Sequence, residues 1–205
     1  MIHNDPLHLL ILTASWLLFA ISHSLLAGTT LHRLFGRYSR IVFNCVAVVM
    51  MLLPFAISAR LPEILLWNEP DWLYWTRHGI SFAAVLALIH TLKFYSLPGF
   101  LGLKAETWTL TFSPWHRWVR HPWYFLTLIL IWAHDMTETW LVNALCITLY
   151  LVAGSRLEEK RILRYHPGSY AQYCHIVPAL LPWRGCALDE VARLKLESEA
   201  LNESK

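Results

Sequence analysis

The sequence predicts an all-α integral membrane protein with about five transmembrane helices. Of its 205 residues, 56% are hydrophobic and only 15% are charged, whereas soluble domains carry about 25% charged residues. Several apolar runs approach the roughly 20 residues that a helix needs to cross a bilayer. The formal net charge of +3 is too small to indicate nucleic-acid binding, and the basic residues gather in alternate loops. Composition, run length and this alternation together predict a membrane-embedded helical protein.

Five apolar runs are the predicted membrane spans. The first carries no formal charge, the second contains Pro54, which membrane helices tolerate, and the third has Lys93 near its end, where it can reach the interface. The fourth is short, so it either tilts little, thins the bilayer or begins inside the protein. An acidic turn joins the fourth run to the fifth, and these two are expected to form a helical hairpin. The runs are residues 7–27, 41–59, 78–97, 123–134 and 139–155.

The charges in the loops predict the orientation. Lysine and arginine concentrate on the cytoplasmic side of membrane proteins. The first and third loops and the segment after the hairpin are basic, so we expect a periplasmic N-terminus and a cytoplasmic C-terminus in a bacterial inner membrane. Four aromatic residues between positions 67 and 75 are typical of a belt at the outer interface. The basic residues of these three segments are Arg33, Arg37, Arg40, Lys93, Lys104, Arg117, Arg120, Arg156, Lys160, Arg161 and Arg164.

The expected organisation is one membrane domain, residues 1–186, followed by a polar cytoplasmic tail, residues 187–205. Apolar residues at Leu188, Val191 and Leu194 indicate a terminal helix in this tail, and we expect the domain to tolerate its removal. No basic stretch precedes the first apolar run, so no cleaved signal peptide is expected. The cysteines and histidines show no ligand spacing, and neither a disulfide framework nor a metal site is predicted.

Chemistry-bearing residues collect at the polar–apolar boundary of the hairpin. Arg120 and His121 precede the fourth run, with Pro122 suited to a first helical position, and Glu158 and Glu159 follow the fifth. A short hairpin brings its open ends together, so we expect a cationic and imidazole cluster opposite a carboxylate pair. Charged groups at the edge of a membrane are costly, and they indicate a functional site.

Each part of this pattern also has a structural interpretation. An arginine at a helix end often anchors topology, and a carboxylate pair can form solvated ion pairs along a helix. The order of the parts is more specific than any one of them. A turn signal at residues 166–168 is further expected to fold the final segment back over the hairpin as a lid. The ordered set is Arg120-His121-Pro122-x-Tyr124, the hairpin, Glu158-Glu159 and then Tyr170-x-x-Tyr173.

This ordered set resembles the isoprenylcysteine carboxyl methyltransferase and phospholipid methyltransferase superfamily. Its bacterial branch, which includes methanethiol S-methyltransferases, shows a similar His-Ser-Leu-Leu-Ala segment, here residues 23–27, and a similar Met-Thr pair, here residues 136–137. The chain departs from the family at Leu126, where a small residue is common, and at residues 165–168, where Phe-Gly is usual. The segments that carry the resemblance are residues 120–124, 157–163, 170–173 and 177–182, within about residues 20–183.

The resemblance implies an enzyme that uses S-adenosylmethionine, bound at the cytoplasmic end of the last two spans. It implies a hydrophobic or small thiol, carboxylate or amine acceptor, which enters from the surrounding membrane lipids. The alternative is a non-catalytic accessory or sensor protein on the same scaffold. The implied catalytic residues are Arg120, which holds a carboxylate, and His121, which helps to deprotonate the acceptor. The implied cofactor contacts are His121, Pro122, Tyr124, Glu158, Glu159, Tyr170 and Tyr173.

Overall fold

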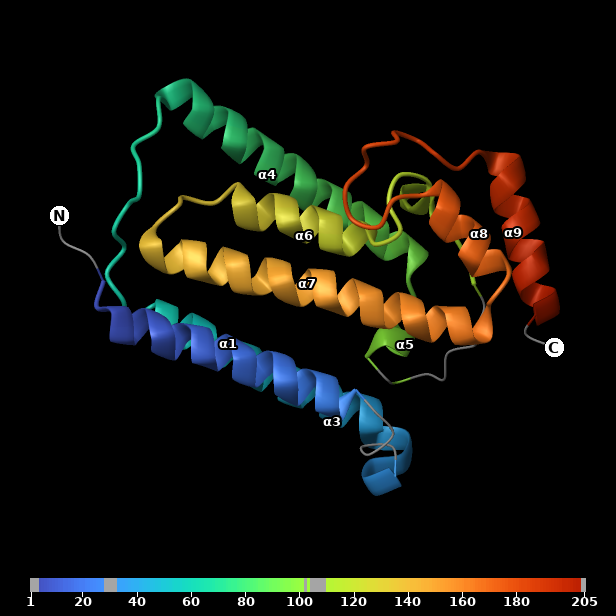
Figure 1. Cartoon of the computed structure of the whole chain (residues 1–205), viewed down its shortest axis with the longest axis horizontal. Helices are drawn as coiled ribbons and strands as arrows, with labels where there is room; N and C mark the ends of the chain where they lie inside the picture. Colours follow the sequence, from blue (N-terminus) through green and yellow to red (C-terminus); the bar gives the residue numbers. More distant parts are fainter. Residues whose placement is uncertain (1–3, 28–32, 102, 104–109, 204–205) are drawn as a thin grey trace. The chain divides into compact units, whose positions relative to one another are not determined.

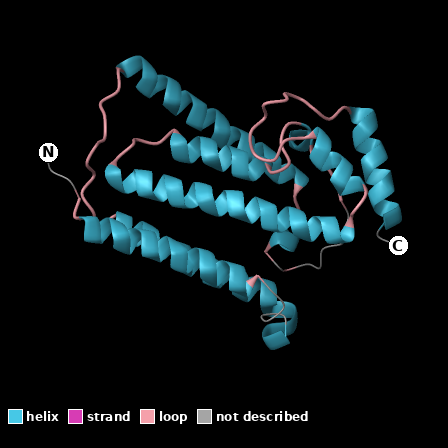
Figure 2. Cartoon of the chain, in the orientation of Figure 1, coloured by secondary structure: helices cyan, strands magenta, loops and turns pink. Residues whose placement is uncertain are grey.

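The structure is a computed structural model of the whole chain, and it describes residues 4–27, 33–101, 103 and 110–203. Over this part the backbone consists of helices joined by loops (Figures 1 and 2). An isolated antiparallel bridge joins Leu65 to Thr137. The all-α prediction is therefore confirmed.

Three helices in the described part are long and apolar enough to cross a membrane. They are α1 (Pro6–Leu26), α3 (Ser39–Ser58) and α7 (Glu138–Tyr165), and they correspond to the first, second and fifth predicted spans. Asp5 caps α1 by accepting a hydrogen bond from the backbone N–H of Leu7 at 2.9 Å. These helices support membrane integration.

The third and fourth predicted spans differ from the helices that form. Helix α4 (Asp71–Thr91) begins before the predicted run and ends earlier. A single 3₁₀ turn, η2 (Leu92–Phe94), and the short α5 (Leu97–Phe100) follow it. Helix α6 (Pro122–Trp132) has only 11 residues, so it is about 16 Å long. Membrane character is thus supported for three helices, and the count of five spans stays a prediction.

The chain divides into two compact units. The first contains Met1–Gly79, Ser96–Ala105 and Ile131–Tyr150. The second contains Ile80–Tyr95, Glu106–Leu130 and Leu151–Lys205, so α4, α6 and α7 contribute residues to both.

In the first unit, α1 and α3 run side by side (Figure 1). Their apolar core is centred on Trp16, which packs edge-on against Phe55 at a centroid distance of 5.5 Å. A buried polar network crosses this core. Trp16 Nε1 donates to Asn143 Oδ1 at 2.7 Å, and Asn143 Nδ2 donates to Ser58 Oγ at 2.8 Å. Such interhelical bonds satisfy groups that lipid cannot solvate.

The second unit has a core beneath α8 (Ser169–Ile176) and α9 (Glu190–Glu203), which lie side by side (Figure 1). Leu188 and Leu196 are buried in this core, whereas Val191 and Leu194 are exposed. The Glu203 carboxylate accepts hydrogen bonds from the backbone N–H groups of Gly168 and Ser169 at 3.1 and 2.9 Å, where α8 begins. Helix α9 thus packs in the core of the second unit, and the expectation that the terminal segment is dispensable stays a prediction.

Candidate active site

Local structure at the hairpin mouth follows from the residues around Pro122. The carbonyl of His121 accepts the first helical hydrogen bond of α6, from Phe125 N–H at 3.0 Å. Pro122 then takes the first helical position, where a missing N–H costs nothing. Glu158 and Glu159 lie on the C-terminal part of α7. All of these residues belong to the second unit, and the expected meeting of the two ends is observed.

Arg120 and Glu159 form a largely buried ion pair within the cluster. Arg120 Nε donates to Glu159 Oε1 at 2.7 Å, and the two side chains are 12% and 16% exposed. Arg120 Nη1 also donates to the carbonyl oxygens of Cys174 and Val177, at 2.9 and 2.6 Å. Burial lowers the pKa of Arg120, but the hydrogen bond to Glu159 and the neighbouring negative groups together outweigh burial, and the pKa is raised. The guanidinium is therefore charged and already holds three oxygen partners.

His121 lies between the two carboxylates. Its Nε2 is 3.0 Å from Glu159 Oε1, its Nδ1 is 3.5 Å from Glu158 Oε2, and its ring stacks on Tyr124 with an interplanar angle of 11°. Burial lowers the pKa of His121, yet its hydrogen bonds to Glu158 and Glu159 outweigh burial and the pKa is raised. Both ring nitrogens are thus arranged to donate, which favours the imidazolium form.

The two carboxylates differ in exposure. The Glu158 side chain is 49% exposed, compared with 16% for Glu159. Tyr124 donates its hydroxyl proton to Glu158 Oε2 at 3.2 Å. Glu159 serves mainly the internal contacts with Arg120 and His121, whereas Glu158 presents oxygen to solvent or to a ligand.

The segment after α8 folds back onto the hairpin mouth, as the turn signal at residues 166–168 predicted. The backbone N–H of Arg120 donates to the carbonyl of Pro178 at 2.9 Å, and that of His121 donates to the carbonyl of Ala179 at 3.1 Å. Together with the Arg120 side chain, these bonds fix residues 174–179 against the start of α6.

Tyr170 and Tyr173 lie in the core of the second unit and are 3% and 1% exposed. Tyr173 donates its hydroxyl proton to the carbonyl of His116 at 2.7 Å, and its ring is 4.3 Å from that of Phe112. Burial raises the pKa of both tyrosines. Their expected contact with a cofactor stays a prediction, and in this structure they support the segment that Arg120 holds.

His116 is a member of this region that the sequence analysis did not single out. It closes the 3₁₀ turn η3 (Pro114–Arg117), with Nδ1 3.1 Å from the backbone nitrogen of Ser113, which donates to it. The proton of the neutral ring therefore sits on Nε2. Burial, and then the charge of His121, lowers the pKa of His116 to about 4. The Ser-Pro-x-His spacing of residues 113–116 is typical of a capped helical turn and could have indicated His116.

Two further observations bear on the chemistry of the site. Leu126, where the chain departs from the resembled family, is 3% exposed and fills space inside the second unit.

Within the described ranges, no three His, Cys, Asp or Glu side chains are arranged to hold a metal ion.

Comparison with known proteins supports the resemblance seen in the sequence. The chain is 27% identical over 197 residues to methanethiol S-methyltransferase of Pseudomonas deceptionensis, covering 86% of this chain and 74% of that protein. It is 29% identical over 203 residues to the enzyme of the same name in Pseudomonas sp. (strain GM41(2012)), covering 87% and 75%. For methanethiol S-methyltransferase 1 of Bradyrhizobium diazoefficiens the identity is 28% over 183 residues, covering 82% of this chain and 64% of that protein.

No protein-family model matches the chain, and no solved structure matches it significantly. The chain is a distant homologue of methanethiol S-methyltransferases, as the ordered motifs predicted. It spans 64–75% of the length of the three relatives named above.

Proposed function

We propose that the protein is a membrane-embedded methyltransferase that transfers the methyl group of S-adenosylmethionine to a small thiol. The observation that carries this proposal is the clustering of Arg120, His121, Tyr124, Glu158 and Glu159 at one mouth of the hairpin. These residues are among those on which the resemblance depends. Homology to methyltransferases over more than 80% of the chain supports the same conclusion.

The residues at this mouth fit the chemistry of S-adenosylmethionine. The half-exposed carboxylate of Glu158 suits the ribose hydroxyls or the ammonium group of that cofactor. The Tyr124 ring offers a face to the adenine or to the sulfonium cation. Arg120 is already held by Glu159 and by two carbonyls, so we assign it to positioning. Pro122, Tyr170 and Tyr173 stay predicted contacts.

S-adenosylmethionine, when bound, supplies an electrophilic methyl group on a sulfonium. Transfer of that group to a thiol is an in-line displacement, so the protein has mainly to align the two reactants and exclude water. The arrangement of His121 between two carboxylates favours the protonated ring, which is not a base. For His121 to deprotonate the acceptor, the ring would first have to lose its proton. We therefore propose that His121 chiefly fixes the orientation of Glu158 and Glu159.

The membrane setting suits such an acceptor. We propose five spans with a periplasmic N-terminus and a cytoplasmic C-terminus in a bacterial inner membrane, so that the soluble cofactor reaches the hairpin mouth from the cytoplasm. A small apolar thiol partitions into lipid and enters from the bilayer. The relatives are methanethiol S-methyltransferases, which favours a thiol over the carboxylate and amine acceptors that the motifs alone leave open.

The rival function is that of a non-catalytic accessory or sensor protein. It is favoured by one observation: Arg120 and His121 already have partners within the protein.

Titration calorimetry in detergent with S-adenosylmethionine separates the two functions. We expect saturable binding, together with formation of dimethyl sulfide when methanethiol is added as the acceptor. Binding without product on any thiol, amine or carboxylate acceptor would support the sensor function. Absence of binding would overturn the proposed function and return the cluster to a structural role.

A further inference from the structure

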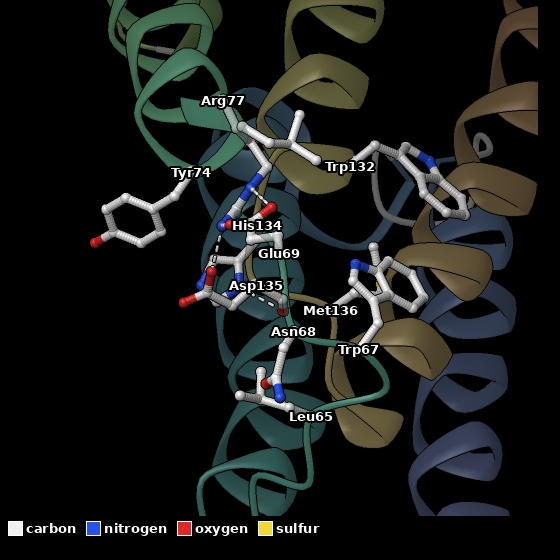
Figure 3. A pocket seen from close by; sticks show the side chains of 11 residues that line it. Leu65, Trp67, Asn68, Glu69, Tyr74, Arg77, Trp132, His134, Asp135 and Met136 are labelled. Carbon is white, nitrogen blue, oxygen red and sulfur yellow. Dashed lines mark hydrogen bonds and ion pairs between the residues drawn. The ribbon is translucent and has the colours of Figure 1, made fainter. Parts of the chain in front are cut away.

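A cavity in the first unit is built from residues that the proposed function does not use. Its volume is about 530 Å³, within the range of roughly 300–1,000 Å³ typical of small-molecule sites. Its lining comes from the loop that precedes α4, from the first turns of α4, from the end of α6 and from the turn between α6 and α7 (Figure 3).

The walls of this cavity are fixed by backbone hydrogen bonds. Leu66 N–H donates to the carbonyl of Met136, and Glu138 N–H donates to the carbonyl of Ile64, both at 3.0 Å. These bonds flank the bridge between Leu65 and Thr137. The loop before α4 is thereby held against the hairpin turn, and the cavity is formed before any ligand arrives.

Charged groups at the centre of the cavity carry a net negative charge. Arg77 on α4 forms ion pairs with Glu69 and with Asp135, and its Nη1 donates to the carbonyl of Ala133 at 2.6 Å. One guanidinium thus faces two carboxylates. Because Arg77 is held by three oxygen-bearing partners, it has little capacity to attract an anion. The Asp135 side chain is 50% exposed, so the surplus negative charge is accessible.

Aromatic and sulfur-containing side chains form the adjoining wall. Figure 3 shows the indole rings of Trp67 and Trp132 on one side of the carboxylate cluster, with Met136 close to Trp67, while Tyr74 points to the other side. The centroid of the Tyr74 ring lies 5.7 Å from Cζ of the Arg77 guanidinium. The cavity therefore combines two indole surfaces with a surplus carboxylate.

We propose that this cavity binds a small organic cation of the quaternary-ammonium type, either free or as the head group of a lipid. Indole faces attract such cations through their negative π-surface, and a nearby carboxylate adds Coulomb attraction. An inorganic cation would keep its hydration shell in front of indole rings, whereas a methylated ammonium sheds water readily. This assignment is independent of the proposed methyltransferase function, since none of the cavity residues belongs to the cluster around Arg120.

Calorimetric titration of the full-length protein in maltoside detergent tests the assignment, with choline as the cation and dimethylbutanol as its neutral isostere. We expect choline to bind at least about tenfold more tightly than dimethylbutanol. A short-chain phosphatidylcholine, titrated separately, distinguishes the two sources of the cation. If it binds more tightly than choline, the ligand is a lipid head group, and if it binds more weakly, the ligand is a free cation.

Variants connect this binding to the cavity. Asp135→Asn keeps the Arg77–Glu69 pair and should weaken choline binding at least about threefold, with little effect on dimethylbutanol. Trp67→Leu should weaken choline binding to a similar extent. Asp71→Asn, at the start of α4 but outside the cavity lining, is the matched control and should change nothing. Equal affinity for the two probes, unchanged choline binding in Asp135→Asn, or absence of choline binding would each overturn the assignment.

Discussion

Arg120 and Glu159, 39 positions apart in the sequence, form an ion pair of 2.7 Å in which both side chains are mostly buried. The same guanidinium holds the carbonyls of Cys174 and Val177. One side chain therefore joins the entrance of α6, the C-terminal part of α7 and the C-terminal end of α8. Removing either partner leaves a buried charge without its partner, which is costly.

Replacement of Arg120 by lysine is expected to reduce cofactor affinity or turnover at least about tenfold, equivalent to about 1.4 kcal/mol. The guanidinium reaches Glu159 through Nε and two carbonyls through Nη1, and a single ammonium group cannot reproduce this fork. Membrane insertion and expression should be normal. Calorimetry with S-adenosylmethionine and a turnover assay measure the effect.

The matched control for this variant is Arg156→Lys, at an exposed position on the same helix as Glu159. It should behave as wild type. Wild-type turnover in the Arg120→Lys protein would show that Arg120 is only a topology anchor.

The two carboxylates are expected to respond differently to neutralisation. Glu158→Gln should lower S-adenosylmethionine affinity by about 1.5–3 kcal/mol, the usual contribution of a hydrogen bond to a charged group, and leave thermal stability nearly unchanged. Glu159→Gln should lower both affinity and the melting temperature, because it removes the partner of Arg120 and His121.

Thermal melts and calorimetry on both variants, with Glu63→Gln as the control, test this difference. Glu63 lies in the loop before α4 and is expected to affect neither property. Cofactor affinity equal to wild type in both site variants would assign the pair to a purely structural role.

The sequence predicted the meeting of Arg120 with Glu159 because the two residues flank a short helical hairpin, whose open ends must approach each other. The sequence could not predict which further groups Arg120 contacts, or which of the two carboxylates is the buried one. The contacts of Arg120 with Cys174 and Val177 depend on where α8 ends, and the exposure of Glu158 relative to Glu159 depends on a rotation of α7 that no local motif specifies.

Helix boundaries show the same limit of sequence reasoning. Residues 71–77 are polar and aromatic, so the apolar pattern placed the third span later, at residues 78–97. Helix α4 nevertheless begins at Asp71, because hydrogen bonding along a helix does not require apolar side chains. In the terminal segment Leu188, Val191 and Leu194 indicated a helix but not its buried side. Leu188 and Leu196 are buried, whereas Val191 and Leu194 are exposed.

The charge on His121 should appear in the pH dependence of stability. Burial lowers its pKa, but the hydrogen bonds to Glu158 and Glu159 raise it above the ordinary 6.5. A raised pKa means that the folded protein binds the proton more tightly than the unfolded chain. The stabilisation from His121 is then complete below 6.5 and is lost as the pH rises through the folded pKa.

Melting temperatures of wild type and His121→Asn measure this effect between about pH 6.5 and 9. The difference between the two proteins should shrink as the pH rises. The acid range is avoided because His116, whose pKa burial lowers to about 4, destabilises the fold as the pH falls below 6.5. A difference that stays constant over the range would contradict a raised pKa for His121.

Reporter fusions are expected to show a cytoplasmic signal after Ala27 and after Lys205, and a periplasmic signal after Trp67. The reason is the concentration of lysine and arginine in the first and third loops and after α7. A periplasmic signal at either of the first two sites would reverse the orientation and exclude a cytoplasmic route for the cofactor.

The terminal helix α9 offers a pair of leucines that differ in burial and little else. Leu196 is 2% exposed within the core that contains Tyr170 and Tyr173, whereas Leu194 is 54% exposed on the same helix. Leu196→Ala should destabilise the second unit by about 2–5 kcal/mol, and Leu194→Ala should change stability by less than about 0.5 kcal/mol. Because Tyr173 and the segment held by Arg120 rest on this core, Leu196→Ala should also weaken S-adenosylmethionine binding. Denaturant or thermal unfolding of the two variants measures the difference, and equal stability would show that α9 is the dispensable tail that its composition predicts.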